Sequence, residues 1–445
     1  MTMVIWPHRS ANLTISPGAD DMPAASATVA SPAQRTAMAA AAAVRIVTTG
    51  FSGATAAPTK AAGLRFVFAG GGTGGHIYPG LAVAEALEQA TKEPVEIIWA
   101  ATARPVDQRL LKGMGRRYVA QSVQPIPRNI KKAWPFVQAW RESCQYWERA
   151  FRETAPHVVL ALGGYAAAPA AFVAAKMGIP VALINPDAVP GIANRQLLRR
   201  AAQTFTQWEL PANLEKKLRG KSSALGCPIR PSILDRTRED AILRLALQPH
   251  YSTLVITGAS LGAQTINDAM VQLLADAEIQ KALAGNAVAG QRPWQILHLA
   301  GQAHGQALEQ AYAALNVKFP FRVMAYCDDM ASVWAAADLT IARAGASTCA
   351  ELTACGVPAI LMPYPYHRDQ HQRHNAQELV NAHAAVLVKD TRQASANAAA
   401  LKEELIPLLS QPGTRKAMSA AARREGKPNA ARDIARELLT MARPA

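Results

Sequence analysis

A glycine-rich loop between an apolar run and a helical pattern constrains the fold of this chain more than any other segment. Glycines at positions 70–72, 74 and 75, followed by His76, separate the apolar run 64–69 from the amphipathic pattern 81–87. A strand, a glycine loop and a helix in this order bring bare backbone N–H groups to the positive end of a helix dipole. The segment therefore predicts a site for an anionic or oxygen-rich ligand at the end of a parallel strand.

The same loop matches the dinucleotide fingerprint G-x-G-x-x-G through Gly70, Gly72 and Gly75. That fingerprint calls for an acidic residue at the end of the following strand, where it would hold a ribose. The next predicted strand, 95–99, runs into Ala-Ala-Thr-Ala without an acid. The sequence thus argues against a nicotinamide dinucleotide.

His76 is the one residue of the loop that a phosphate site does not need. An imidazole at the start of a helix, after a Gly-Gly pair, can accept a proton near neutral pH. A structural histidine is the alternative interpretation of this position. We predict a catalytic role for His76 because of the loop in which it stands.

Short apolar strands alternate with amphipathic helices from residue 64 onward. This alternation predicts the α/β class, with parallel sheets covered by helices on both faces. The predicted strands are 66–69, 95–99, 158–162, 181–184, 254–257, 295–299, 321–324, 339–341 and 359–362.

The strand and glycine-loop pattern occurs a second time, at 254–263, after a segment rich in proline and glycine at 226–231. Two Rossmann-like domains with a ligand cleft between them follow, because ligands bind at the carboxyl ends of such strands. We expect a disordered extension or an over-long gene start at 1–62, an N-terminal domain at 63–228 and a C-terminal domain at 229–427. Residues 428–445 are expected to form a helix that packs back on the N-terminal domain.

The charge balance of the chain points to an acidic partner. Its 445 residues carry 47 Lys and Arg against 32 Asp and Glu, a formal net charge of +15. Phosphorylated substrates or an anionic membrane surface fit this balance. Neither zinc-finger spacing nor interleaved aromatic and basic residues favours nucleic acid. The 5 cysteines are scattered, which indicates neither a disulfide framework nor a cysteine metal site and fits a reducing cytoplasm.

The extension is rich in Ala, Ser, Thr and Pro and lacks the large aliphatic residues of a core. Its alanine-rich run, 37–44, is too short to span a bilayer and follows Asp20 and Asp21 where a signal peptide would carry basic residues. No later segment approaches twenty uninterrupted apolar residues. Any membrane contact is therefore expected to be peripheral.

Several ordered motifs together resemble the MurG family, the GlcNAc transferases that complete the lipid-linked disaccharide of peptidoglycan. The resemblance runs from about residue 64 to the C-terminus. Its motifs are GGGTGGH at 70–76, GGY at 163–165, AVPGIAN at 188–194, the segment 226–230, GASLGA at 258–263 with Asn267, and RAGASTCAE at 343–351.

The resemblance implies a GT-B fold and inverting transfer of GlcNAc from UDP-GlcNAc to the 4-hydroxyl of MurNAc-pentapeptide on undecaprenyl diphosphate. It places the protein at the cytoplasmic face of the bacterial cell membrane, bound peripherally. Two alternatives remain open at this point: a related GT-B transferase with another lipid acceptor, such as a diacylglycerol, and a non-catalytic module that binds a nucleotide sugar or lipid.

The resemblance also assigns the donor site. Glu351 would hold the ribose hydroxyls, Ser260 would meet the phosphates and Arg230 would contact the nucleotide. Gln372 and Asn375 would reach the transferred sugar. A carboxylate can accept two ribose hydrogen bonds, which gives Glu351 a chemical reason to stand there. The remaining donor residues are Thr73, Gly74, Gly75, Asp187 and Cys327, the last through its backbone.

On the acceptor side the resemblance implies that Thr73 and His76 face the acceptor diphosphate, together with Gly72, Tyr165 and Asn194. Asp187 stands where the family usually has Asn. An ionised carboxylate only accepts hydrogen bonds and can raise the basicity of a nearby imidazole. We therefore predict that Asp187 shares acceptor activation with His76, the alternative being a structural Asn-Pro-Asp turn.

The segment 126–140 combines basic and aromatic residues in the pattern of a membrane-docking surface. Lys131, Lys132, Trp134, Phe136 and Trp140 are its candidates, with ordinary core packing as the alternative. No Asp-x-Asp motif follows a strand. We expect no cofactor and no metal ligands, with helix dipoles and hydrogen-bond donors stabilising the departing UDP.

Overall fold

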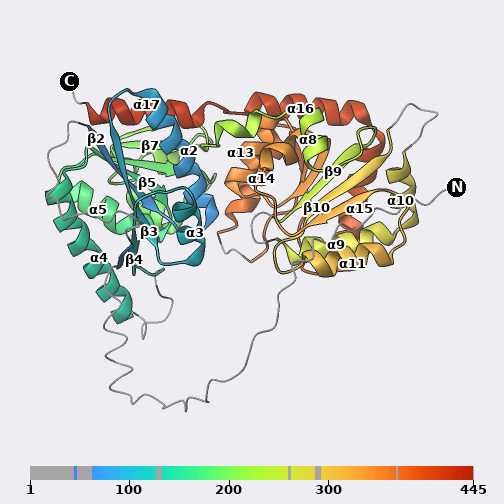
Figure 1. The fold of residues 1–445 in the computed structure, drawn as a ribbon, viewed down its shortest axis with the longest axis horizontal. Coiled ribbons are helices and arrows are strands. Elements are labelled where there is room, and N and C mark those ends of the chain that lie inside the picture. Colours follow the sequence, from blue (N-terminus) through green and yellow to red (C-terminus); the bar gives the residue numbers. More distant parts are fainter. Residues whose placement is uncertain are drawn as a thin grey trace, which may run out of the picture. The chain divides into compact units, whose positions relative to one another are not determined.

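The computed structural model describes residues 45–47, 63–125, 127, 133–258, 262–285, 292–366 and 369–443. Within them the chain forms two β-sheets, one of eight strands and one of six, with helices packed on both faces of each (Figure 1). The α/β class and the two Rossmann-like domains predicted from the sequence are confirmed.

The N-terminal domain is built on the eight-stranded sheet, in the order β1-β4-β3-β2-β5-β6-β7-β8. All of its neighbouring strands are parallel except β1 and β4. Its strands are β1 (Arg45–Val47), β2 (Leu64–Gly70), β3 (Val95–Thr102), β4 (Tyr118–Gln121), β5 (Val158–Gly163), β6 (Val181–Asn185), β7 (Gln203–Thr206) and β8 (Lys221–Ser223).

Strand β1 lies in the segment 1–62 that the sequence analysis assigns to a disordered extension. Its backbone pairs antiparallel with the edge strand β4. A short β-branched run next to an unpaired strand edge can add to the sheet in this way. These three residues thus form a strand, and the rest of the extension, up to residue 62, lies outside the described residues.

Helices cover both faces of the first sheet. One face packs against α2, α3 and α17, the other against α4, α5 and α6. The helical elements of this half are α2 (Gly74–Ala90), α3 (Pro105–Gly113), α4 (Ala133–Thr154), η2 (Tyr165–Ala167), α5 (Ala168–Lys176), α6 (Ile192–Leu197) and α7 (Ala212–Glu215).

The C-terminal domain is built on a fully parallel sheet in the order β11-β10-β9-β12-β13-β14. This is the strand order 3-2-1-4-5-6 of a Rossmann fold, and the direction of winding reverses next to β9. The strands are β9 (Ser252–Thr257), β10 (Trp294–Leu299), β11 (Phe321–Met324), β12 (Leu339–Ala342), β13 (Ala359–Leu361) and β14 (Ala385–Leu387).

Two clusters of buried side chains fill the spaces between this sheet and its helices. One cluster includes α9, α10, α11 and α15, the other α8, α12, α13 and α14. The helical elements are η3 (Pro231–Leu234), α8 (Arg238–Arg244), α9 (Gln264–Ala275), α10 (Ala277–Ala284), α11 (Gly305–Ala314), α12 (Met330–Ala336), α13 (Ala346–Cys355), α14 (His371–Asn381), α15 (Ala394–Ser410) and α16 (Pro412–Glu425).

The chain passes between the two domains twice. The first passage runs from β8 to η3, and the second runs from α16 to α17 (Ala430–Ala442), which packs on α2 of the N-terminal domain. The passages touch, because Lys427 Nζ donates 2.7 Å hydrogen bonds to the carbonyl oxygens of Gln207 and Ala224. Gly226 has a φ of +110°, and a Cβ atom there would lie 2.7 Å from Lys427 Cβ.

Candidate active site

A cavity of about 1520 Å³ opens between loops that follow the strands of both sheets. From the N-terminal domain it is lined by the loops after β2, β5 and β6, and from the C-terminal domain by the loops after β11, β12 and β13. The carboxyl ends of the strands thus converge on one space. The predicted residues that line it are Thr73, Gly74, Gly75, His76, Tyr165, Asp187, Asn194, Arg230, Cys327, Glu351 and Gln372.

His76 stands in the first turn of α2, where its ring packs against the backbone of the loop after β5. A Cβ atom on Gly164, whose φ is +75°, would lie 3.0 Å from the ring carbon Cε1. Only glycine at this position lets the imidazole lie so close to the strand end.

The hydrogen bonds of His76 define its tautomer. Nδ1 lies 3.2 Å from the carbonyl oxygen of Gly71 and 3.2 Å from Thr73 Oγ1. A carbonyl only accepts, so Nδ1 carries the proton and Nε2 keeps its lone pair. Burial lowers the pKa of His76, while the charge of Asp187 acts in the opposite direction. The side chain is therefore a neutral proton acceptor at physiological pH.

Asp107 holds the glycine loop in place and was not foreseen from the sequence. Its carboxylate is fully buried and accepts hydrogen bonds from Gly72 N at 2.8 Å and from Thr102 N at 2.9 Å. The Thr102 hydroxyl donates a third bond at 2.6 Å. Arg104 adds a bond from Nη1 to the Gly72 carbonyl at 3.1 Å. Asp107, in the first turn of α3 after β3, therefore binds the backbone of the glycine loop and does not stand at the strand end where a dinucleotide site has its ribose-binding acid.

Gly72 thus acts through its backbone, and it is not among the residues that line the cavity. Tyr165, which does line it, lies beneath the Arg104 guanidinium, 5.8 Å from the ring centre. Asn194 is buried and donates from Nδ2 to Asn185 Oδ1 at 3.0 Å. Its Oδ1 has no hydrogen-bond partner among the described residues, which leaves an acceptor at the cavity wall.

Asp187 and Asn375 join the two domains. Asn375 Nδ2 donates to Asp187 Oδ1 at 2.8 Å, and Asn375 Oδ1 accepts from Ala188 N at 2.8 Å. A third bond runs to the Ala344 carbonyl at 3.1 Å. Asn375 is completely buried and does not line the cavity. Its amide therefore supports Asp187 in this structure and does not face the space predicted for the sugar.

Glu351 lies near the middle of α13, with its carboxylate at the cavity. Trp334 Nε1 donates to its Oε2 at 2.7 Å. Burial raises the pKa of Glu351 to about 7, although the Trp334 bond and the charge of Arg230 act to lower it. The Arg230 guanidinium itself lies over the Tyr78 ring, 5.3 Å from its centre. Glu351 is thus an acceptor whose charge changes near neutral pH.

The start of α13 adds groups that can bind an anion. Gly345, Ala346, Ser347 and Thr348 all line the cavity, and α13 begins at Ala346. Free backbone N–H groups and the helix dipole therefore meet the cavity here together with two hydroxyls. The sequence prediction named Ser260 for this role, and Ser260 lies outside the described residues.

Gln372 and Cys327 line the same cavity from α14 and from the loop before α12. Gln372 Oε1 accepts a 2.9 Å hydrogen bond from Tyr364 N, so its amide fixes the loop after β13. Burial raises the pKa of the Cys327 thiol, which keeps it protonated.

Tyr78 and Tyr326, which the sequence analysis did not single out, face each other from the two domains with their hydroxyl oxygens 3.2 Å apart.

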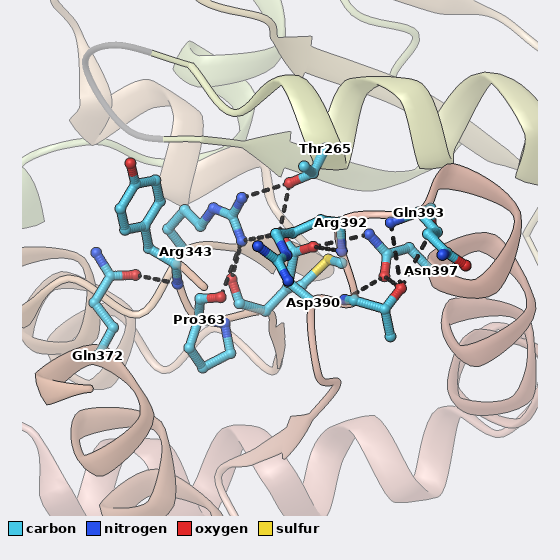
Figure 2. A network of polar contacts seen from close by, with 11 residues as sticks. Thr265, Arg343, Pro363, Gln372, Asp390, Arg392, Gln393 and Asn397 are labelled. Carbon is cyan, nitrogen blue, oxygen red and sulfur yellow. Dashed lines mark hydrogen bonds and ion pairs between the residues drawn. The ribbon is translucent and has the colours of Figure 1, made fainter. Parts of the chain in front are cut away.

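A buried polar network supports the C-terminal side of the cavity (Figure 2). Arg343, after β12, pairs with Asp390 at 2.9 Å and donates to Thr265 Oγ1 at 2.7 Å and to the Met362 carbonyl at 2.8 Å. The Asp390 side chain is 0% exposed. Arg343 therefore ties together the ends of β12, β13 and β14 and the start of α9.

Aromatic residues at the start of α4 belong to the segment that we predict from the sequence to dock on a membrane. Trp134 is 73% exposed, and nearby Val137 and Phe172 are also exposed. Phe136 stacks on Trp140 with ring centres 6.3 Å apart, and Trp140 meets Phe172 at 5.9 Å. Lys131 and Lys132 lie outside the described residues. None of the helices in the described part of the chain is long and apolar enough to cross a membrane.

Two family descriptions match this chain. The glycosyltransferase family 28 N-terminal domain matches residues 66–206, and the glycosyltransferase family 28 C-terminal domain matches residues 253–437. Each match falls on one of the two sheets described above.

The sequences of named relatives align with this chain over nearly their whole length. The UDP-N-acetylglucosamine–N-acetylmuramyl-(pentapeptide) pyrophosphoryl-undecaprenol N-acetylglucosamine transferase of Halothermothrix orenii is 35% identical over 382 residues, covering 82% of this chain and 95% of the relative. The protein of the same name from Desulforamulus reducens is 33% identical over 380 residues, covering 83% and 97%. The crystal structure of Acinetobacter baumannii MurG superimposes with a TM-score of 0.63 at 26% identity, covering 85% and 99%.

These matches bear out both the GT-B fold and the family that the sequence motifs indicated. The chain is a glycosyltransferase and belongs to the MurG family of UDP-N-acetylglucosamine–N-acetylmuramyl-(pentapeptide) pyrophosphoryl-undecaprenol N-acetylglucosamine transferases.

Proposed function

We propose that this chain transfers GlcNAc from UDP-GlcNAc, with inversion, to the 4-hydroxyl of MurNAc-pentapeptide carried on undecaprenyl diphosphate. The observation that supports the proposal is that His76 and Glu351 line one cavity, His76 from the N-terminal domain and Glu351 from the C-terminal domain. We assign the role of proton acceptor to His76 and that of ribose acceptor to Glu351. The names of the relatives supply the chemistry of donor and acceptor.

In this mechanism His76 Nε2 takes the proton of the acceptor hydroxyl as its oxygen attacks C1 of GlcNAc. The bond between C1 and the UDP phosphate oxygen breaks, and UDP leaves with the electron pair. Attack on the face opposite the leaving group inverts the anomeric centre. Asp187 stabilises the imidazolium that forms, since its negative charge favours the protonated ring.

The donor is held by the C-terminal domain. Glu351 accepts the ribose hydroxyls, and Trp334 orients its carboxylate. The phosphates meet the start of α13 and the glycine loop that contains Ser260, with Arg230 nearby. Helix N-termini stabilise the negative charge that develops on the departing UDP. The acceptor diphosphate lies on the N-terminal side, near Thr73 and the start of α2.

The protein is further proposed to act at the cytoplasmic face of the membrane, docked on an anionic surface through the start of α4. Exposed Trp134 supports this, because indoles favour the interface and the adjacent Lys131 and Lys132 attract anionic headgroups. In a vesicle-sedimentation assay, Trp134→Ser is expected to weaken binding to anionic vesicles. The matched control is Leu243→Ser, because Leu243 is 79% exposed on α8. Equal behaviour of the two variants would assign docking to another surface.

Transfer of radiolabelled GlcNAc from UDP-GlcNAc to a lipid-linked muramyl acceptor tests the reaction itself. Parallel assays with UDP-galactose and with diacylglycerol separate this activity from that of a related transferase. Turnover only with UDP-GlcNAc and the muramyl acceptor is expected. Preference for another acceptor would reassign the substrate, and UDP binding without any transfer would indicate a binding module.

A further inference from the structure

A second recess, of about 480 Å³, lies in the C-terminal domain between η3, the end of α12 and one face of α16. Its walls contain many cations and a single carboxylate, that of Asp338. The cations are Arg236, Arg238, Arg415, Lys416 and Arg423. Trp334, the indole that bonds Glu351, lines this recess as well as the active-site cavity.

Helix α16 presents the cations through its own periodicity. Pro412, Arg415, Lys416, Ser419 and Arg423 follow one another at helical spacing, and all line the recess. Arg415 and Lys416 stand close to the helix N-terminus, and the first turn contains no acidic residue. The helix dipole already places partial positive charge at that end. Two cations there are electrostatically unfavourable, and an anion in the recess would relieve this.

Two of the arginines are fixed by protein groups. Arg238 pairs with Asp338 at 2.8 Å and also donates to the Tyr251 carbonyl at 3.1 Å. Arg415 donates to the Leu409 carbonyl at 3.1 Å, and its guanidinium lies 4.8 Å from the centre of the Trp294 ring. Asp338 therefore balances Arg238, and its charge also favours the charged form of Arg415, so it has fixed arginines on both sides.

Arg236 is incompletely satisfied. Its Nε is buried and lies 3.8 Å from Asp329 Oδ2, beyond hydrogen-bond distance. Within the described residues this nitrogen has no hydrogen-bond partner. Lys416 and Arg423 are exposed on α16, and no ion pair joins either of them to a described carboxylate. Arg236 thus keeps its ion pair with Asp329 and has one nitrogen without a hydrogen bond, whereas Lys416 and Arg423 have no ion-pair partner among the described residues.

We propose that this recess binds a small soluble phosphate-bearing anion, of the size of pyrophosphate or a phosphorylated sugar. Guanidinium groups match phosphate oxygens in charge and in geometry, and lysine adds a mobile point charge. The volume lies within the range of small-molecule sites, and the walls are concave. This site is separate from the nucleotide and acceptor sites of the proposed reaction and does not depend on that reaction.

Isothermal titration calorimetry with inorganic pyrophosphate at physiological ionic strength tests the proposal on the full chain. Lys416→Glu combined with Arg423→Glu is expected to weaken one class of pyrophosphate site about tenfold or more. The matched control combines Arg424→Glu with Arg432→Glu. It makes the same change in net charge at exposed positions that do not line the recess, and is expected to bind as the wild type does. Pyrophosphate bound in the active-site cavity contributes equally to all three titrations.

Lys416→Gln with Arg423→Gln provides a second variant without charge reversal, and thermal unfolding verifies that each protein is folded. Equal weakening in the recess variant and in its matched control would reduce the effect to overall charge and overturn the proposal. So would the lack of any site sensitive to Lys416 and Arg423. Vesicles of phosphatidylglycerol form the third arm: binding to them that requires Lys416 and Arg423, without pyrophosphate binding, would replace the soluble anion with a lipid headgroup.

Discussion

Asn375 of the C-terminal domain donates a 2.8 Å hydrogen bond from Nδ2 to the Asp187 carboxylate of the N-terminal domain. The same amide accepts from the backbone N–H of Ala188, so one side chain binds two consecutive residues of the loop after β6. Asp187 also influences His76, whose pKa its charge raises. Asp187 therefore makes two contributions that an experiment can separate: a contact between the domains and an electrostatic effect on His76.

Asp187→Asn separates them. An asparagine can still present its carbonyl oxygen to Asn375 Nδ2, so the domain contact survives. Loss of the negative charge lowers the pKa of His76 further. Because the neutral imidazole is the active base, the acidic limb of the kcat profile should move to lower pH, and kcat should fall about tenfold through weaker basicity. A pH profile identical to that of the wild type would assign Asp187 to the loop alone.

His76→Ala removes the proposed base. Loss of a general base costs about 10² to 10⁴ in kcat. UDP affinity should hardly change, because the proposed contacts of the nucleotide, at Glu351 and the start of α13, come from the other domain. Thr73→Ala is the comparison: the Gly71 carbonyl still fixes the His76 tautomer in that variant, and loss of the proposed diphosphate contact should raise the acceptor KM more than it lowers kcat. Equal losses in the two variants would show that loop shape, and not the imidazole, determines the rate.

The ionisation of Glu351 should govern donor binding. Its pKa of about 7 means that the carboxylate becomes protonated as the pH falls below neutrality, and a protonated acid accepts fewer ribose bonds. UDP affinity measured by calorimetry should therefore weaken below pH 7, by at most about tenfold per pH unit. Glu351→Gln should bind UDP about 1–3 kcal/mol more weakly at pH 8 and show no such pH dependence.

Trp334→Phe tests whether the hydrogen bond from Trp334 stabilises the ionised form of Glu351. The indole N–H favours the ionised form of Glu351, so its loss should raise the pKa further. The pH below which UDP binding weakens should move upward, while affinity well above that pH changes little. A uniform loss of affinity at every pH would mean that Trp334 contributes packing only.

Asp107→Asn should disturb the glycine loop. One carboxylate oxygen becomes an NH₂ group that must face the N–H donors of Gly72 or Thr102. A buried donor left without an acceptor costs about 1–3 kcal/mol, so the free energy of unfolding should fall by this amount, with a parallel loss in kcat. Thr102→Val removes only the 2.6 Å hydroxyl bond and should have the smaller effect in urea denaturation.

Arg343→Met should be the most destabilising of these changes. It leaves the buried Asp390 carboxylate without its ion-pair partner, which costs about 3–5 kcal/mol. Calorimetry measures the free energy of unfolding of Arg343→Met and of the double variant Arg343→Met with Asp390→Asn, each against the wild type. The double variant should recover part of the loss, because it removes the unpaired charge as well. Without such recovery, packing and not charge would explain the cost.

The sequence indicates the architecture because most strands are continuous apolar runs buried on both faces. The strands that the sequence analysis does not predict are β1, β4, β7, β8 and β14. Two of them lack an apolar run: β7 is Gln-Thr-Phe-Thr and β8 is Lys-Ser-Ser. They lie toward one edge of the first sheet and depend on neighbours to be recognised as strands. A local hydrophobicity pattern does not contain that information.

The sequence predicts residues that line the cavity where they belong to a loop motif, as His76 does. It was not predictable where function depends on a contact between distant segments. Asp107 reaches the glycine loop across 35 positions, and Asn375 reaches Asp187 across 188. Nothing in the neighbourhood of Asn375 indicates that its amide is buried under the other domain. For the same reason the recess on α16 becomes visible only once η3 and α12 are folded beside it.

The touching passages at Gly226 and Lys427 give the two domains a single pivot. Both passages of the chain between the domains lie at this one place, so a rotation of one domain against the other about it would leave both hydrophobic cores intact. Away from the pivot, two hydrogen bonds connect the domains: Tyr78 with Tyr326, and Asn375 with Asp187. The bond between the neutral tyrosines contributes about 0.5–1.5 kcal/mol, and the bond to the Asp187 carboxylate about 1.5–3 kcal/mol. A ligand that contacts both domains adds a free energy of the same order, so occupation of the cavity would stabilise this arrangement of the domains.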